Sequence, residues 1–258
     1  MTPIRAGLVV LGCLALAFAF GFYFELPWAL AFWPWPDTSL SYTFVGAIAG
    51  AIGAATLWLG VSGELGAISA GAISVVVMLG GIAATLGVYG IQSGDPRLFS
   101  EAGFAAVAAL GAFGAFLWGR RFAGGDSRPM PVAVRGSFVA FLVVLVLAGG
   151  ALLLQIPNVL PWRVLPETSV LFGWIFLGDA AFFLYAAVQG RWIAAPGPLL
   201  AFLAYDLVLF GPLSLRWATV APEQQLSLLI YLAVLAYSAL LAIFYLFVHR
   251  PTRLIASK

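Results

Sequence analysis

The chain of 258 residues is 63% apolar and only 9% charged, with a mean hydropathy of +1.07. About a quarter of the residues in soluble globular proteins are charged, so this composition excludes a soluble globule and indicates a polytopic protein of the lipid bilayer. The formal net charge is only +2, and the sequence contains no basic cluster interleaved with aromatic residues, which nucleic-acid-binding surfaces usually have. Nucleic acid is therefore excluded as a partner.

Eight apolar stretches approach the roughly 20 residues that a membrane-spanning helix needs. They cover residues 6–25, 39–60, 65–89, 99–119, 136–155, 169–189, 196–214 and 225–248. Proline, glycine and charged residues, which favour turns, separate these stretches. The sequence therefore predicts an all-α polytopic membrane protein with about eight transmembrane helices. Gly80-Gly81 leaves open whether the third helix is continuous, because small residues in pairs can kink a helix.

Basic residues in short loops collect on the cytoplasmic side of a membrane. With the N-terminus inside, nine of the 12 basic residues lie in inner loops and tails, namely Arg5, Arg120, Arg121, Arg128, Arg135, Arg191, Arg250, Arg253 and Lys258. The outer loops hold Arg97, Arg163 and Arg216. This bias predicts a multi-pass protein of the bacterial inner membrane with both termini in the cytoplasm.

An internal repeat is a further signal. A shift of 130 positions without a gap superposes residues at helix boundaries: Arg5 on Arg135, Pro27 on Pro157, Leu30 on Leu160, Gly60 on Gly190 and Gly81 on Gly211. We expect an N-terminal four-helix repeat at 1–124, a cytoplasmic linker at 125–135 and a C-terminal four-helix repeat at 136–258. Because four is even, both repeats have the same orientation and should be related by an axis along the membrane normal.

The same shift superposes Pro36-Asp37-Thr38-Ser39 on Pro166-Glu167-Thr168-Ser169. Threonine or serine can accept a hydrogen bond from a free N–H at a helix start, and the helix dipole favours an acid there. The helix-capping loops before the second and sixth helices are therefore predicted to contain Asp37, Thr38, Ser39, Glu167, Thr168 and Ser169. An anion or metal site is less favoured, since one acid per loop gives no convergent ligands.

The run Trp33-Pro34-Trp35-Pro36-Asp37-Thr38 and its counterpart Leu165-Pro166-Glu167-Thr168 resemble a loop motif of uncharacterised multi-pass bacterial membrane proteins. The resemblance covers these two short segments. It implies the multi-pass topology and no particular activity.

Small residues are dense in the second to fourth helices, and small residues on one face let helix backbones approach closely in lipid. The glycines expected at helix-packing faces are Gly46, Gly50, Gly53, Gly111 and Gly114. Such faces suit docking onto other membrane-protein subunits or onto a second copy of the chain.

Asp179 and Asp206 lie within the sixth and seventh predicted helices. Each is about ten residues, or roughly 15 Å, from the start of its helix, so both are expected near the bilayer centre on adjacent antiparallel helices. An aspartate there costs on the order of 2.5–3.5 kcal/mol, and no lysine or arginine lies within any predicted span. We therefore expect at least one neutral carboxyl group, and we hypothesise an intramembrane acidic pair that shares a proton.

The possible hydrogen-bond partners of the two acids are Tyr185, Tyr205, Tyr237 and Ser238. A structural role, in which each protonated acid forms a helix–helix hydrogen bond, weighs about equally with a functional role, because intramembrane acids are functional by default but not by necessity. In a functional role, the missing partner is a transported proton or cation, a bound ligand, or a basic residue of another subunit.

Enzyme chemistry has little support in the sequence. His249 is the only histidine and Cys13 the only cysteine, and no phosphate-binding loop or nucleophile elbow is present. We expect no catalytic residue, no metal and no cofactor. The leading interpretation is a non-enzymatic accessory or assembly subunit that packs against other membrane proteins or itself. The alternative is a proton-coupled permease for a small solute that uses Asp179 and Asp206.

Labelling of introduced cysteines tests the topology. On a background without Cys13, a cysteine beside Asp37 or Glu167 should react with a membrane-impermeant reagent added from outside, because both loops are predicted to be external. A cysteine beside Asp126 should stay unlabelled until the membrane is opened. The reverse pattern would overturn both the topology and the orientation of the repeats.

Overall fold

The computed structural model of the chain describes residues 2–122 and 126–254. Eight of its helices are long and apolar enough to cross a membrane, and no β-strand occurs in these two ranges. The predicted all-α fold with eight membrane-spanning helices is therefore confirmed. Gly124, at the predicted end of the first repeat, and Lys258, among the predicted inner basic residues, lie outside the described residues.

The spanning helices are α1 (Pro3–Tyr23), α3 (Ser39–Ser62), α4 (Ile68–Ser93), α5 (Pro96–Gly119), α6 (Val132–Leu153), α7 (Pro166–Gln189), α8 (Pro196–Leu215) and α9 (Gln225–Ile243). The shorter elements are α2 (Pro27–Leu30), the 3-10 turns η1 (Leu65–Ala67), η2 (Trp192–Ala194) and η3 (Pro222–Gln224), and the π-helical turn η4 (Phe244–Val248). α4 runs without interruption through Gly80-Gly81, so the third spanning helix is continuous.

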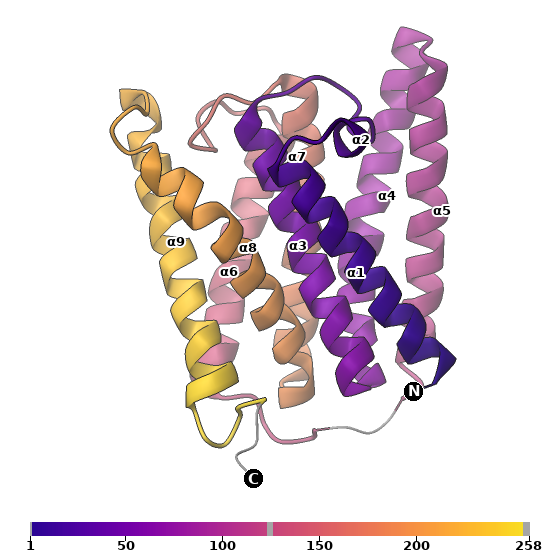
Figure 1. The fold of residues 1–258 in the computed structure, drawn as a ribbon, viewed down its shortest axis with the longest axis vertical. Coiled ribbons are helices and arrows are strands. Elements are labelled where there is room, and N and C mark those ends of the chain that lie inside the picture. The colour runs from indigo at the N-terminus through magenta and orange to yellow at the C-terminus, as the bar shows by residue number, and fades with distance from the viewer. Residues whose placement is uncertain (1, 123–125, 255–258) are drawn as a thin grey trace. The chain divides into compact units, whose positions relative to one another are not determined.

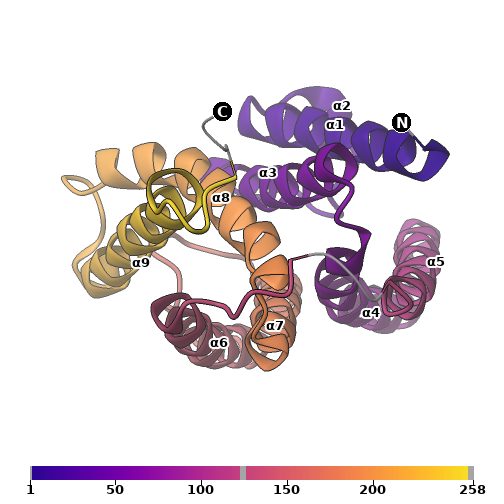
Figure 2. The same cartoon turned by 90° about the horizontal axis from the view of Figure 1, so that it is seen from below.

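The chain forms two compact units. Unit 1 comprises Met1–Glu64, Asn158–Val164 and Ala195–Lys258. Within it, α1 packs on α3, α3 on α8, and α8 on α9, so the four helices follow one another in that order (Figure 2). α1 begins and α9 ends at the same end of this unit (Figure 1).

Unit 2 comprises Leu65–Pro157 and Leu165–Ala194. Within it, α5 packs on α4, α4 on α7, and α7 on α6, again in one order (Figure 2). Each unit therefore takes one helix pair from the predicted N-terminal repeat and one from the predicted C-terminal repeat. The predicted repeats succeed each other along the chain and do not coincide with the compact units.

Four spanning helices begin earlier than predicted: α6 starts at Val132, four residues before its predicted start, and the other three start at a proline. α1, α5 and α7 start at Pro3, Pro96 and Pro166, three residues before the predicted starts. Proline lacks the N–H that the first helical turn leaves unbonded in any case, and its fixed φ suits that turn. These prolines therefore belong to the helices and not to the breaks before them.

The loop before α3 caps that helix. Thr38 is the N-cap, and its Oγ1 accepts a hydrogen bond from the backbone N–H of Ser41 at 3.3 Å. Asp37 Oδ1 accepts one from the Thr38 N–H at 2.7 Å. Ser39 is the first residue of α3 and so follows the cap.

The loop before α7 does not cap its helix through Thr168 or Ser169, and that prediction is wrong. The N-cap is Leu165, which has no side-chain hydrogen bond, because the helix already begins at the proline that follows. Thr168 and Ser169 are buried in the first turn, where Ser169 Oγ donates to Leu152 O at 2.9 Å. Glu167 is the acid of that first turn, where the helix dipole favours it.

α1 and α6 end with the same geometry. Glu25 and Gln155, which follow the C-caps of these helices, have positive φ angles of 52° and 55°. The next backbone N–H in each case donates to the carbonyl five residues before it, at 2.8 Å and 2.9 Å. This is the Schellman arrangement, which satisfies carbonyls that the helix end leaves free. Glu25 and Gln155 lie 130 positions apart.

Two arginines bind the ends of neighbouring helices. Arg5 of α1 donates from Nε to Gly60 O of α3 at 3.0 Å, and Arg135 of α6 donates from Nε to Ala187 O of α7 at 3.0 Å. Both carbonyls lie in the last turn, where they lack a helical partner and where the dipole favours a cation. Arg5 and Arg135 are also 130 positions apart.

Glycines allow α1 and α3 to approach closely. A β-carbon added at Gly46 would lie 3.0 Å from Ala19 O, and one added at Gly53 would lie 3.1 Å from Gly12 O. Because these neighbours are backbone atoms, the two helices could not accommodate larger residues without separating. Gly50 has more room, because a β-carbon added there would lie 3.7 Å from Ala19 Cβ.

Gly111 and Gly114 of α5 differ from the glycines of α3. Apart from the neighbouring residues and adjacent backbone of α5 itself, no heavy atom of the described chain lies within 4 Å of a β-carbon placed at either position. Among residues 2–122 and 126–254, these two glycines therefore have no neighbouring helix at their β-carbon positions. That they pack against a molecule outside the chain stays a prediction.

Replacement of Gly12 by alanine should loosen the pair of α1 and α3. The new β-carbon would lie 2.8 Å from Leu57 N and 3.0 Å from Leu57 Cα, atoms that move only with α3. Overpacking of this kind costs about 1–3 kcal/mol, so the melting temperature of the purified protein in detergent should fall. Gly7→Ala, in the same helix but without an atom within 4 Å, should melt at or slightly above the wild-type temperature. Equal melting of the two variants would contradict this packing.

Candidate functional site

Unit 1 buries one acid in a spanning helix. Asp206 lies ten residues after Pro196, the first residue of α8, which is roughly 15 Å along the helix axis. Its side chain is 2% exposed. α3 and α9 pack on α8, and none of these three helices carries another Asp, Glu, Lys, Arg or His. The carboxyl group therefore has no counter-charge on the helices that surround it.

Ser238 of α9 is the hydrogen-bond partner of Asp206. Ser238 Oγ lies 2.8 Å from Asp206 Oδ2 and 2.8 Å from Val234 O, the carbonyl one turn earlier in α9. It also lies 3.2 Å from Leu235 O. A hydroxyl group has a single proton, so Ser238 can donate to the carboxyl group or to the carbonyls of its own helix, but not to both.

The geometry fits the neutral carboxyl group. When Asp206 is protonated, it can donate to Ser238 Oγ, and Ser238 can donate to Val234 O, so each proton has an acceptor. An ionised carboxylate would take the only Ser238 proton and still keep Oδ1, which has no hydrogen-bond partner among the described residues. A buried, unpaired charge is much costlier than an unpaired neutral acceptor.

An aromatic cluster joins α3, α8 and α9 beside this site. It consists of Phe44 of α3, Trp162 of the segment 158–164, Tyr205 of α8 and Tyr231 of α9. The Trp162 ring centroid lies 5.9 Å from that of Phe44 and 6.0 Å from that of Tyr231. The Phe44 and Tyr205 rings are 6.0 Å apart. The hydroxyl groups of Tyr205 and Tyr231 form a hydrogen bond, so α8 and α9 share a second polar contact besides Asp206 and Ser238.

The segment 158–164 covers one end of unit 1. Trp162 is 3% exposed, and its Nε1 donates to Ser41 Oγ in the first turn of α3 at 3.2 Å. Ser227 Oγ, in the first turn of α9, donates to Asn158 O. The segment is therefore held at the starts of α3 and α9.

Asp179 belongs to unit 2, whereas Asp206 belongs to unit 1. Asp179 lies in α7 next to Gly178, where an added β-carbon would be 2.8 Å from Ser74 O of α4. The Asp179 side chain is half-buried, and no hydrogen bond or ion pair joins it to another residue in the described part of the chain. The hypothesis that Asp179 and Asp206 share a proton stays a prediction.

The predicted partners of the acids lie in different places. Ser238 binds Asp206, whereas the Tyr205 hydroxyl binds Tyr231. Tyr185, in unit 2, accepts a hydrogen bond at its hydroxyl from Gln189 Nε2 at 2.9 Å. Tyr237 of α9 is 51% exposed and lies on the outer side of that helix.

Sequence reasoning missed Tyr231 and the contact of Trp162. Tyr231 lies seven residues before Ser238, and residues two turns apart share a helix face, so this spacing was a usable signal. The bond from Trp162 to Ser41 joins residues 121 positions apart. Nothing in a single sequence indicates such a pairing.

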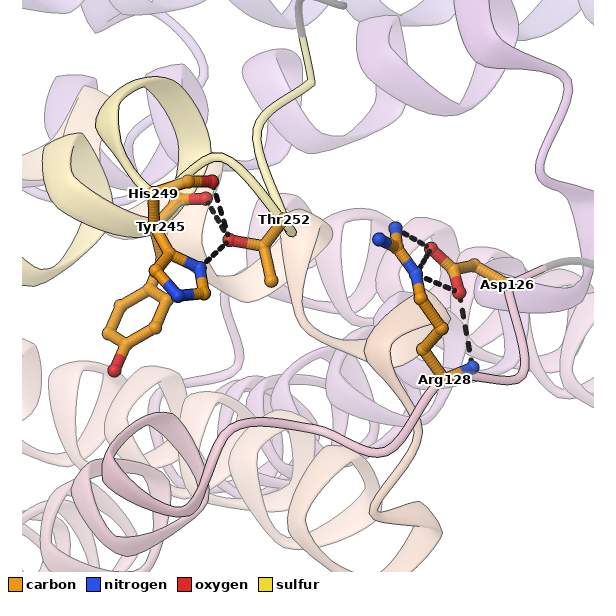
Figure 3. Close-up of polar contacts among 5 residues, drawn as sticks. All are labelled: Asp126, Arg128, Tyr245, His249 and Thr252. Carbon is orange, nitrogen blue, oxygen red and sulfur yellow. Dashed lines mark hydrogen bonds and ion pairs between the residues drawn. The ribbon is translucent and has the colours of Figure 1, made fainter.

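The C-terminal turn after α9 has its own polar contacts. His249 Nδ1 lies 2.8 Å from Thr252 Oγ1, which donates to Tyr245 O at 2.7 Å (Figure 3). Because the threonine proton goes to the carbonyl, the histidine Nδ1–H is the donor to Thr252. His249 thus fastens the chain after η4 and takes no part in the Asp206 site.

Asp126 and Arg128 form an ion pair in the loop before α6 (Figure 3). Arg128 Nε donates to both Asp126 carboxylate oxygens, at 2.8 Å and 2.9 Å. Hydrogen bonding from the Arg128 side chain lowers the pKa of Asp126, and the same bond raises the pKa of Arg128. The Trp192 N–H donates to Arg128 O at 2.7 Å, so this loop is anchored to the segment after α7.

In the part of the chain that the structure describes, no three His, Cys, Asp or Glu side chains are grouped so that they could hold a metal ion. Comparison of the chain with protein-family models, curated proteins and solved structures found no match.

A double-mutant cycle measures the bond between Asp206 and Ser238. Asp206→Ala and Ser238→Ala each remove one partner, and their coupling free energy should be about 0.6 kcal/mol and not above roughly 1.7 kcal/mol, as for interhelical hydrogen bonds in other membrane proteins. In the control cycle, Ser137→Ala replaces Ser238→Ala. Ser137 lies in unit 2 and donates to Ala133 O of its own helix, so its effect should add to that of Asp206→Ala. Equal coupling in both cycles would contradict the bond.

Proposed function

We propose that the protein is a non-enzymatic permease that couples the movement of a small solute to a proton bound at Asp206. The observation that carries this proposal is a carboxyl group midway along a spanning helix, 2% exposed, with Oδ2 bound to Ser238 and Oδ1 without a partner among the described residues.

The cost of the buried acid supports a functional role. An aspartate at the centre of a spanning helix costs on the order of 2.5–3.5 kcal/mol, whereas one interhelical hydrogen bond stabilises by about 0.6 kcal/mol on average. The bond to Ser238 offsets only a small part of this cost. Acids inside membranes commonly belong to proton relays and ion pathways. A proton pathway requires a group that can gain and lose a proton, and the carboxyl group of Asp206 is such a group.

The predicted duplication also supports transport. Glu25 with Gln155 and Arg5 with Arg135 have matching geometry 130 positions apart, and parallel repeats related by an axis along the membrane normal are one architecture of secondary transporters. In this proposal, α1, α3, α4 and α5 correspond to α6, α7, α8 and α9. Each unit then combines the first helix pair of one repeat with the second pair of the other.

Asp206→Asn should abolish proton-coupled transport, because asparagine keeps the shape of the side chain and some hydrogen bonding but cannot carry the proton. Proteoliposomes with an entrapped pH-sensitive dye would be exposed to pools of amino acids, sugars and small organic amines. At least one pool should acidify the lumen of wild-type vesicles, and none should acidify vesicles with Asp206→Asn. Asp126→Asn, in the loop before α6, should retain the flux. Acidification that persists in Asp206→Asn would contradict the proposal.

A second candidate function is assembly with other membrane proteins or with a second copy of the chain. A face of α5 favours it: at Gly103, Gly111 and Gly114, an added β-carbon would have no heavy atom of the described chain within 4 Å, apart from the neighbouring residues and adjacent backbone of α5 itself. Glycines on a lipid-facing helix permit close approach of another helix. This function and transport do not exclude each other, since a permease can be oligomeric.

The native mass in mild detergent tests assembly. The combined change Gly111→Leu and Gly114→Leu should reduce the wild-type assembly to the monomer, because leucine side chains keep a partner helix at a distance. Gly7→Leu, at a position of α1 that is likewise without neighbours within 4 Å, should leave the mass unchanged. A wild-type protein that runs as the lone monomer would contradict assembly.

A further inference from the structure

We propose that the hydroxyl groups of Tyr205 and Tyr231 are the proton-transfer groups through which Asp206 exchanges its proton, and that this proton enters unit 1 at the end covered by the segment 158–164. The inference rests on the proposed function, because it requires a carboxyl group at Asp206 that gains and loses a proton. The inference gives the tyrosine pair a function. If Asp206 had only a structural role, the tyrosine pair would not be needed.

The tyrosine pair and the acid lie along the same contact between α8 and α9. Tyr205 and Asp206 are neighbours in α8, and both reach α9, Tyr205 at Tyr231 and Asp206 at Ser238. Tyr231 and Ser238 are seven residues apart, which places them about two turns apart on one face of α9. The polar groups between α8 and α9 therefore form a short series, with the tyrosine pair nearer the start of α9.

The start of α9 is the end from which a proton can reach the pair. Ser227 in its first turn binds Asn158, and the Trp162 ring lies 6.0 Å from the Tyr231 ring. Trp162 in turn donates to Ser41. The segment 158–164 thus brings the Asn158 carbonyl to the start of α9 and the Trp162 ring to Tyr231. The residues beyond Ser238 toward the end of α9 are the apolar Ala239, Leu240, Leu241, Ala242 and Ile243.

The transfer step balances without a redox partner. One tyrosine hydroxyl gives its proton toward the Asp206 carboxylate and takes another from the second hydroxyl, which is reprotonated from the covered end of unit 1, so neither tyrosine changes its net charge. Tyr205 and Asp206 occupy neighbouring positions in α8, and in this proposal the last transfer passes through one water molecule, a distance over which proton transfer is efficient. The result is a neutral carboxyl group that can donate to Ser238.

Few other titratable groups lie on the elements packed against Asp206. α3 carries Tyr42, α8 carries Tyr205, and α9 carries Tyr231 and Tyr237, while the segment 158–164 adds Arg163. Tyr42 accepts a hydrogen bond at its hydroxyl from the Asp37 N–H at 2.8 Å, which holds it near the start of α3. Arg163 and Tyr237 are exposed. The Tyr205 and Tyr231 pair is therefore the candidate on these elements, because it joins α8 and α9, the helices that carry Asp206 and Ser238.

Hydrogen–deuterium exchange of the Asp206 carboxyl group, followed by infrared spectroscopy of the full chain in lipid, tests the inference. The relevant band is the protonated carboxyl C=O stretch that Asp206→Asn removes. Tyr205→Phe and Tyr231→Phe, which remove only a hydroxyl group, should each slow the exchange about tenfold or more. Tyr237→Phe, the same change on the exposed side of α9, should exchange at the wild-type rate.

The outcomes separate the two proposals. Wild-type exchange in both Tyr205→Phe and Tyr231→Phe, with the carboxyl band present, would overturn the role of the tyrosine pair and leave the proposed function intact. A spectrum in which Asp206→Asn removes no protonated carboxyl band at any pH would overturn the proposed function. Slowing in every folded variant of the tyrosine pair, but not in Tyr237→Phe, supports the inference, whereas slowing in only one of two folded variants would overturn the relay through both hydroxyl groups. Melting temperatures establish which variants are folded.

Discussion

The absence of water from the bilayer core is the constraint on which this structure depends, because each polar group there must find its partner within the protein. Several hydroxyl groups in the spanning helices find that partner in their own helix. Thr43 donates to Ser39 O and Ser137 to Ala133 O, each one turn earlier in its own helix. A carboxyl group cannot do the same, since it accepts at two oxygens and carries at most one proton. Asp206 therefore needs a partner on another helix and obtains only one, at Oδ2.

In unit 2, one glycine allows both the close approach of two helices and the hydrogen bond of a buried N–H group. A β-carbon at Gly81 of α4 would lie 2.0 Å from Trp174 Cδ2 of α7, so the indole occupies the space that the glycine leaves. From that position Trp174 Nε1 donates to Thr85 Oγ1 at 3.0 Å, one turn further along α4. Tryptophan has a large apolar surface but one N–H that requires an acceptor when buried. The glycine thus permits both the contact of α4 with α7 and the hydrogen bond.

The sequence predicted the fold better than the site. The eight spans follow from apolar length alone, and the errors at Pro3, Pro96 and Pro166 arise because a proline can either end a loop or begin a helix. Asp206 was identifiable as an acid inside an apolar stretch, and Ser238 as a possible partner. Its depth of burial, the orphan Oδ1 and the contact of Trp162 with Ser41 depend on which helices pack together. That information is distributed over residues far apart in sequence, and hydropathy does not contain it.

Asp179 and Asp206 lie in helices that have similar positions within their units but different positions within the predicted repeats. α8 and α7 are inner helices of unit 1 and unit 2, each with a packed helix on both sides, yet α8 belongs to the second helix pair of its predicted repeat and α7 to the first. A shift of 130 positions places Asp206 on Val76 and Asp179 on Ala49, so neither acid has an acidic counterpart. If the chain arose by duplication, the acids were acquired separately. Asp206 is bound to Ser238 whereas Asp179 has no hydrogen bond among the described residues, so proton chemistry, where it exists, is expected to be asymmetric between the units.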